Sequence, residues 1–137
     1  FTFIIQKIVD FGIAGVCSNV QILKGNAGSL MYIAPEVANQ LPNAITTAVD
    51  IWAMGCMMFG MLFGDLPFSS KNAEEVIEKV KTGNFTFPKI PKISEEAKDI
   101  INLMLTIDPK SRPNINELYD HPWLKNKVVK FSIHSYN

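Results

Sequence analysis

Residues 50–63 read DIWAMGCMMFGMLF, and this stretch decides the fold class. The apolar run from Ile51 to Phe63 lies between Asp50 and Asp65 and is shorter than the roughly 20 residues that a membrane-spanning helix needs. A helix that is apolar on almost all sides lies at the centre of a domain. We therefore expect a buried central helix over residues 48–63 that begins at Thr47 or Asp50. Two tryptophans and four methionines are assigned to the core: Trp52, Trp123, Met54, Met57, Met58 and Met61.

Three more helices are predicted downstream of the central one. Apolar residues at helical spacing mark residues 72–82, the stretch after Ser94, and a short segment after Asn114. The start and stop signals are, in chain order, Asn72 with Gly83, Ser94 with Asp108-Pro109, and Asn114 with Glu117 before His121-Pro122-Trp123. The downstream part is therefore expected to be helical throughout.

Composition excludes several classes of protein. Lys plus Arg number 13 and so do Asp plus Glu, which gives no sign of a nucleic-acid or membrane partner. The two cysteines, Cys17 and Cys56, are far apart, which argues against a disulfide framework or a zinc site and favours a reducing compartment. Phe1 to Ile5 is apolar but lacks the basic start of a signal peptide. We expect an intracellular, cytoplasmic location.

The part upstream of the central helix has a different pattern. Residues 3–9 are rich in β-forming residues and run into a turn at Asp10-Phe11-Gly12, and residues 13–34 form a long loop. The expected class is thus mainly α, with one short strand. A single strand has no partner to pair with, so we expect that the chain is truncated. A carboxylate at a strand end, as at Asp10, suits a hard cation such as magnesium.

Several motifs in fixed order carry a resemblance to a known family. Asp10-Phe11-Gly12 and Ala34-Pro35-Glu36 bracket the long loop, as the motifs at the two ends of a kinase activation loop do. The other matching segments are residues 28–33, residues 50–55, Pro67-Phe68, residues 105–109, Ser111-Arg112-Pro113 and His121-Pro122-Trp123. With these the chain resembles the C-terminal half of a eukaryotic-type protein kinase domain. It looks most similar to the calcium/calmodulin-dependent Ser/Thr group, which includes the calcium-dependent protein kinases.

The resemblance implies a division of the chain. Residues 1–124 would be a partial protein kinase domain, with an activation segment over 10–36 and a helical lobe over 37–124. Residues 125–137 would be a C-terminal tail. The fold implied is the helical lobe of a kinase, truncated before the catalytic loop.

The resemblance also implies roles for individual residues. Val9, Asp10, Phe11 and Gly12 match the nucleotide-binding end, where Asp10 would hold magnesium against the phosphates of ATP. Gly28, Ser29 and Tyr32 match the segment that receives the protein substrate. Asp50 matches a residue that anchors the catalytic loop.

Glu36 and Arg112 match an ion pair that joins the activation segment to the helical lobe. A buried arginine can bind a carboxylate through two parallel hydrogen bonds. Two unrelated surface charges would be the ordinary interpretation of a glutamate and an arginine so far apart in sequence. The surrounding motifs favour the pair.

The chain also departs from the family pattern. It has no Gly-rich phosphate loop, no strand lysine and no His-Arg-Asp catalytic loop, so no catalytic base is present. Gly25 occupies the usual phosphorylation position, and Gly60 replaces a glutamate that some kinases use to bind a substrate arginine. Two functions stay open: a fragment of a Ser/Thr kinase that is inactive alone, or a pseudokinase or kinase-derived interaction module. The expected partners are a protein substrate and ATP in the parent, where a calcium-binding module is also left open.

Overall fold

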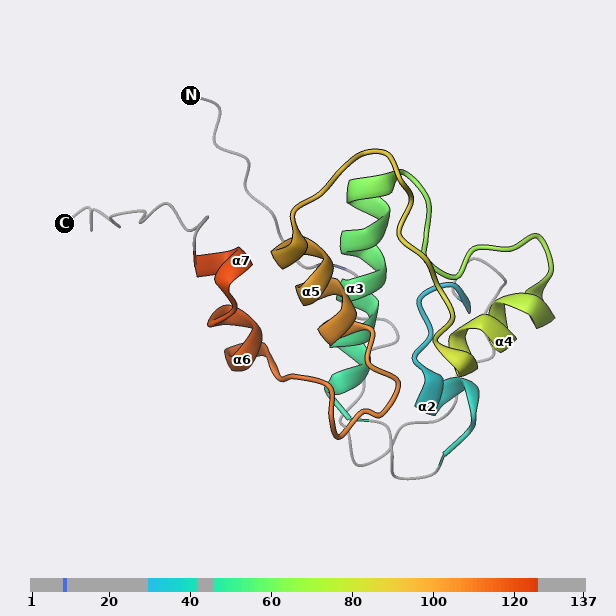
Figure 1. Ribbon diagram of the computed structural model, residues 1–137. Helices are drawn as coiled ribbons and strands as arrows, with labels where there is room; N and C mark the ends of the chain where they lie inside the picture. Colours follow the sequence, from blue (N-terminus) through green and yellow to red (C-terminus); the bar gives the residue numbers. More distant parts are fainter. Residues whose placement is uncertain (1–8, 10–29, 42–45, 126–137) are drawn as a thin grey trace.

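The computed structural model describes residues 9, 30–41 and 46–125. Within this part the chain forms six helices, numbered as in Figure 1. They are α2 (Pro35–Ala38), α3 (Ala48–Phe63), α4 (Ala73–Thr82), α5 (Glu95–Met104), α6 (Ile115–Tyr119) and α7 (Pro122–Lys125). The described part is therefore helical, as the sequence predicts.

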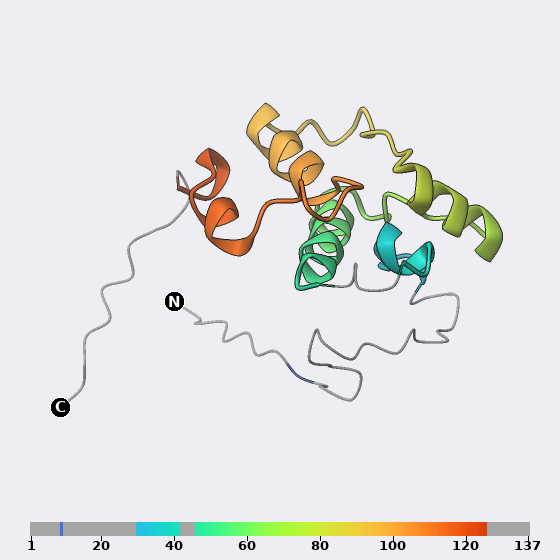
Figure 2. The ribbon, with the colours of Figure 1, turned by 90° about the horizontal axis from the view of Figure 1, so that it is seen from below.

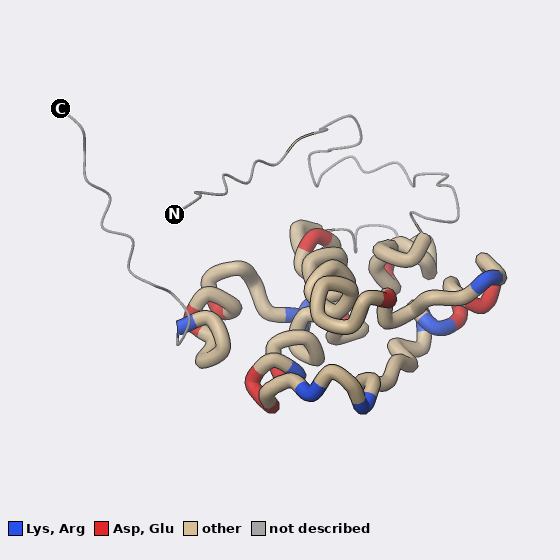
Figure 3. The backbone as a smooth tube through the Cα atoms, turned by 90° about the horizontal axis from the view of Figure 1, so that it is seen from above, with Lys and Arg blue, Asp and Glu red and all other residues tan. Residues whose placement is uncertain are grey.

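Helix α3 lies at the centre of this arrangement. Helices α2 and α4 lie on one side of α3 and helices α6 and α7 on the other, in both Figure 1 and Figure 2. The sequence between Asp50 and Asp65 carries no charged residue, and Figure 3 shows the charged residues mainly on the surrounding helices. Six residues of α3 are buried: Ile51, Trp52, Gly55, Cys56, Met58 and Phe59. The predicted central helix is confirmed at its predicted bounds.

The outer helices begin at the predicted caps. The Asn72 side chain accepts a hydrogen bond from the Glu74 backbone N–H at 2.9 Å, and the Ser94 hydroxyl accepts one from Ala97 at 3.3 Å. The cap of α6 is a full capping box, in which Asn114 and Glu117 each accept from the other's backbone N–H. These bonds satisfy N–H groups that a helix start leaves without partners.

An aromatic cluster connects α3 to the extended chain after α4. The Phe59 ring lies 5.8 Å from that of Phe85 and 5.9 Å from that of Phe87, measured between ring centroids. Phe85 also meets Phe68 edge-on at 5.7 Å. These contacts cover α3 with a segment that has no regular structure of its own.

Two short helices are not predicted by the sequence, and one predicted helix end is wrong. No pattern indicates α2 or α7, although α6 ends at Tyr119, before His121-Pro122-Trp123 as expected. Helix α5 ends at Met104 rather than at Asp108-Pro109. The side chain of Asp108 instead accepts hydrogen bonds from Lys110 N–H and the Ser111 hydroxyl, which form a separate turn.

The assignment of all four methionines to the core is also wrong. Met58 is buried, but Met54, Met57 and Met61 are 39%, 47% and 80% exposed. They lie on the part of α3 that no described helix covers completely. The tryptophans agree better with the expectation, since Trp52 is fully buried and Trp123 packs against the core while partly exposed.

The strand predicted over residues 3–9 lies outside the described residues, apart from Val9, which is not in a strand. Among the helices that the structure describes, none combines the length and the apolar character that crossing a membrane requires.

Candidate functional site

Arg112 is the centre of the candidate site. Its guanidinium donates two hydrogen bonds to the Glu36 carboxylate, from Nη1 to Oε1 at 2.9 Å and from Nη2 to Oε2 at 3.0 Å. This is the bidentate geometry in which an arginine and a carboxylate bind most strongly. The pair joins α2 to the loop before α6, across 76 positions of the chain.

The remaining donors of Arg112 bind backbone carbonyls. Nη1 donates to Ala48 at 2.6 Å, Nη2 to Ile107 at 3.2 Å, and Nε to Thr106 at 2.9 Å. With the two bonds to Glu36, all five N–H groups of the guanidinium are used. One side chain therefore fixes α2, the first turn of α3 and the carbonyls that follow α5.

Both side chains of the pair are fully removed from solvent. The Arg112 guanidinium also lies 5.1 Å from the centre of the Trp52 ring, which stacks on Phe68 at 5.2 Å with planes 7° apart. A cation over an indole face is attracted by the negative centre of the ring. Burial of two charges is tolerated here because each is paired and every guanidinium donor has an acceptor.

Local sequence explains the position of Glu36. Pro35 occupies the first turn of α2, where its missing N–H costs no hydrogen bond. Glu36 follows in the same turn and is 1% exposed. The helix therefore begins at the Ala34-Pro35 step and directs the next side chain into the interior.

The other predicted site residues lie apart from this pair. Asp50, in the first turn of α3, is exposed and its side chain makes no hydrogen bond with a described residue. Tyr32 is 39% exposed and lines a cavity beside α3. Val9 is 73% exposed. Asp10, Phe11, Gly12, Gly28 and Ser29 lie outside the described residues.

Several features of the site carry no sequence signal. The three carbonyl acceptors of Arg112 belong to the backbone, so no residue type marks them. The Trp52 indole N–H is buried and has no acceptor among the described residues, which its assignment to the core did not predict.

Two residues that sequence reasoning left without a role are structural. Burial raises the pKa of the Cys56 thiol to about 12, against the opposing effect of Arg112, so the thiol is neutral and unsuited to nucleophilic chemistry. His121 is 8% exposed, lies 3.1 Å from the Asp99 carboxylate and accepts the Trp123 N–H at the start of α7.

Comparison with known proteins identifies the family. The family model for the protein kinase domain matches residues 4–124. The chain belongs to the protein kinase family. A protein kinase matches it at 42% identity over 122 residues, the SNF1-related protein kinase catalytic subunit alpha KIN12 of Arabidopsis thaliana. That match covers 89% of this chain and 24% of the relative.

Two further kinases match the prediction about the calcium/calmodulin-dependent group. The calcium/calmodulin-dependent protein kinase type II of Schizosaccharomyces pombe is 39% identical, with 86% of this chain and 23% of the relative covered. The calcium and calcium/calmodulin-dependent serine/threonine-protein kinase of Pisum sativum is 37% identical, with 90% and 24% covered. The chain thus spans about a quarter of the length of these kinases.

A solved kinase structure has the same arrangement of helices. The twitchin kinase region from C. elegans matches with a TM-score of 0.66 and 33% sequence identity, over 72% of this chain and 17% of that one. The described helices are therefore the helical lobe of a protein kinase fold.

Proposed function

We propose that this chain is part of a Ser/Thr protein kinase that transfers the γ-phosphoryl group of ATP to hydroxyl groups of a protein substrate. In this proposal residues 1–124 belong to the kinase domain, with the activation segment over 10–36 and the helical lobe over 37–124. Residues 125–137 form the tail. The relatives named above, all protein kinases, support the reaction class.

The observation that carries the proposal is the buried Glu36–Arg112 pair. Glu36 is the last residue of the proposed activation segment, and Arg112 binds it to α3 and to the loop after α5. Phosphoryl transfer depends mainly on positioning and electrostatics. The helical lobe contributes a fixed attachment for the substrate-binding segment. The ion pair itself takes no part in the chemistry.

The other assigned residues complete the proposal. Gly28, Ser29 and Tyr32 face the protein substrate, and Val9, Phe11 and Gly12 belong to the nucleotide end. Asp50 accepts hydrogen bonds from the catalytic loop of the parent protein. Its carboxylate is exposed and has no hydrogen-bond partner among the described residues, so it is available for this role.

Apart from Val9, the residues assigned to magnesium and ATP lie outside the described part. Asp10 would hold the metal, which neutralises phosphate charge when bound. The described residues contain no group of three His, Cys, Asp or Glu side chains placed to hold a metal ion.

A phosphoryl-transfer assay tests the proposal in two arms. The parent protein should phosphorylate Ser or Thr peptides with ATP and magnesium, and Asp10→Asn should abolish turnover. A polypeptide of these 137 residues should show none, because the sequence contains no His-Arg-Asp loop and no phosphate loop. Turnover by this polypeptide above contaminant controls would contradict the proposal.

A non-catalytic role is the second candidate, and the catalytic loop of the parent protein would decide between the two. A parent protein that binds partners but neither ATP nor magnesium, and that gives no turnover, would be a pseudokinase or interaction module. A parent that carries His-Arg-Asp with an asparagine five residues later, and that is active, would exclude this candidate.

A further inference from the structure

His121 is a buried histidine whose two ring nitrogens both have partners. Its side chain is 8% exposed. Nδ1 accepts a hydrogen bond from the Trp123 backbone N–H at 3.2 Å, and Nε2 lies 3.1 Å from Oδ2 of Asp99. Asp99 belongs to α5 and Trp123 to α7, so the ring connects these two helices.

The two partners determine where the ring carries its proton. A backbone N–H can only donate, so Nδ1 must be unprotonated to accept the bond from Trp123. A carboxylate accepts, so the single proton of the neutral ring lies on Nε2 and is donated to Asp99. A second proton would go to Nδ1 and would turn this acceptor into a donor that faces another donor. The contact with Trp123 therefore requires a neutral ring.

The start of α7 depends on this contact. Pro122 has no N–H, and the N–H groups of Leu124 and Lys125 both donate to the His121 carbonyl at 3.0 Å. The Trp123 N–H is the remaining donor of the first turn, and it uses the imidazole. Helix α7 packs on α5 and α6, and its residues form part of the wall of the cavity of about 730 Å³ beside α3.

The other charged groups on the helices around the ring do not take its place. Asp99 is the charged group that contacts the ring. Six more charged residues belong to α5, α6, α7 and the turn between them: Glu95, Glu96, Lys98, Glu117, Asp120 and Lys125. Glu95 pairs with Lys98 at 2.6 Å, Asp120 pairs with Lys125 at 3.2 Å, and Glu117 accepts the Asn114 N–H in the capping box of α6. The surroundings are thus mixed in charge, with a carboxylate nearest to the ring.

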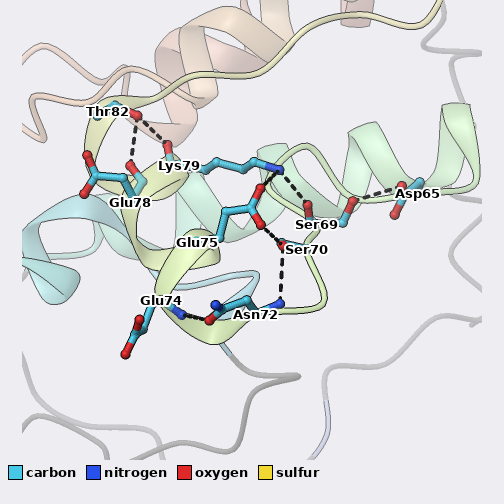
Figure 4. A network of polar contacts seen from close by, with 9 residues as sticks. All are labelled: Asp65, Ser69, Ser70, Asn72, Glu74, Glu75, Glu78, Lys79 and Thr82. Carbon is cyan, nitrogen blue, oxygen red and sulfur yellow. Dashed lines mark hydrogen bonds and ion pairs between the residues drawn. The ribbon is translucent and has the colours of Figure 1, made fainter.

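The start of α4 provides a contrast within the same molecule. The Asn72 amide oxygen accepts the Glu74 N–H at 2.9 Å, in the network that Figure 4 shows. This network consists of carboxylates, hydroxyls, a lysine and an amide, and it contains no histidine. Histidine is the side chain that ordinarily changes its charge between about pH 5 and 8. The cap of α7 is therefore sensitive to protons in this range, and the cap of α4 is not.

We propose that His121 is a pH-sensitive switch that holds the start of α7 when the ring is neutral and releases it when the ring is protonated. The imidazolium stays beside Asp99, because its attraction to the carboxylate increases with the charge. The Trp123 N–H loses its acceptor, and a positive charge at a helix start is itself unfavourable. Mild acid thus loosens α7 from α5, whether or not the parent protein is an active kinase.

Amide hydrogen exchange on the ¹⁵N-labelled parent protein tests the inference. Rates are measured by NMR at about pH 8 and about pH 5, the limits between which an imidazole changes charge, and are divided by the intrinsic rate at each pH. The protection of the Trp123 N–H should fall about two- to tenfold at the lower pH, the worth of one hydrogen bond. The protection of the Glu74 N–H should not change. An equal fall at both positions would indicate general loosening and would overturn the inference.

His121→Asn is the matched variant. An asparagine oxygen can accept the Trp123 N–H, as Asn72 does for Glu74, and it takes up no proton in this range. The variant should therefore keep the protection of Trp123 at both pH values. A pH response as large as that of the unsubstituted protein would assign the effect to another group and reject His121 as the switch.

The ring nitrogens give a test that needs no substitution. In parent protein labelled with ¹⁵N-histidine, the ¹⁵N chemical shifts at about pH 8 should show Nε2 protonated and Nδ1 unprotonated, and both should be protonated at about pH 5. A proton on Nδ1 at the higher pH, or a ring that stays neutral at the lower pH, would contradict the inference. So would a protonated ring with unchanged protection of Trp123.

Discussion

At the scale of single residues, the described structure depends most on Arg112. Its five donors bind Glu36 and three backbone carbonyls, so one truncation leaves several buried acceptors without partners. The pairing with Glu36 can be predicted from the sequence, because both residues lie in recognisable motifs. The carbonyl contacts and the packing on Trp52 cannot, since they depend on how α3 and the loop after α5 meet in space.

We expect Arg112→Ala to lower the free energy of unfolding by about 3–5 kcal/mol, because Glu36 is then a buried unpaired charge. Glu36→Ala together with Arg112→Ala should cost clearly less than the sum of the single changes. Denaturant unfolding of the parent protein, analysed as a double-mutant cycle, measures the coupling.

The exposed pair Glu75–Lys79 is the control for this cycle. Its atoms lie 3.2 Å apart, but both side chains are partly solvated, so its coupling should stay within about 0.5 kcal/mol. Equal coupling in the two pairs would show that burial does not set the strength of the Glu36–Arg112 contact.

Glu75 gives a prediction about pH. The Ser70 hydroxyl at 2.6 Å, and then Lys79, hold the pKa of the Glu75 carboxyl below its usual value of 4.5. Its contribution to stability is therefore present above about pH 4.5 and is lost as the pH falls through the lowered pKa. Ser70→Ala should raise this pKa towards 4.5, as measured by carboxyl NMR titration. The lowered pKa of Asp108, which depends on Ser111, should not change.

At the scale of elements, the helices that the sequence predicts are those with a long periodic stripe or a polar cap. Asn72, Ser94 and Asn114 each cap the helix they were expected to cap. Helices α2 and α7 are too short to show a period of 3.6 residues, which is why pattern analysis missed them. The assignment of the exposed α3 methionines to the core is wrong because the sequence of a uniformly apolar helix does not show which of its faces other elements cover.

The glycines after α3 and α4 give a matched test of helix termination. Both are left-handed, with φ of 78° at Gly64 and 66° at Gly83. A Cβ at Gly64 would meet no atom within 4 Å, whereas one at Gly83 would lie 2.7 Å from Ile107 Cδ1. Gly64→Ala should cost about 1–2 kcal/mol for the backbone alone, and Gly83→Ala should cost more.

Ile107→Ala in the Gly83→Ala background should remove the excess, since no Cδ1 atom remains to be displaced. Urea unfolding of the unsubstituted protein and the three variants measures these differences. Equal costs at the two glycines would mean that the Ile107 side chain moves aside without resistance.

At the scale of the whole molecule, the described helices leave one side of α3 apolar and partly open. Met57 and Met61 lie on it, and exposed apolar surface of this kind favours association. A polypeptide of these 137 residues should therefore bind an apolar dye and associate at micromolar concentration. Met57→Glu with Met61→Glu should reduce both effects, as measured by dye fluorescence and light scattering.

Ile90→Glu is the control, because Ile90 is 83% exposed but does not line this cavity. It should leave dye binding unchanged. A monomer with a sharp cooperative melt and no dye binding would contradict the expectation that this exposed apolar face causes association.

The contact between Arg112 and Glu36, which are far apart in the sequence, also affects how the molecule responds to proteolytic cleavage. Residues 88–92 between α4 and α5 are all exposed and include Lys89 and Lys92, at which trypsin can cleave. A cut there separates the chain into one piece with α2, α3 and α4 and another with α5, α6 and α7. Because α5 packs on α3 and Arg112 binds Glu36 across the cut, we expect the two pieces to stay together as a noncovalent complex, held by this buried ion pair and the core around it.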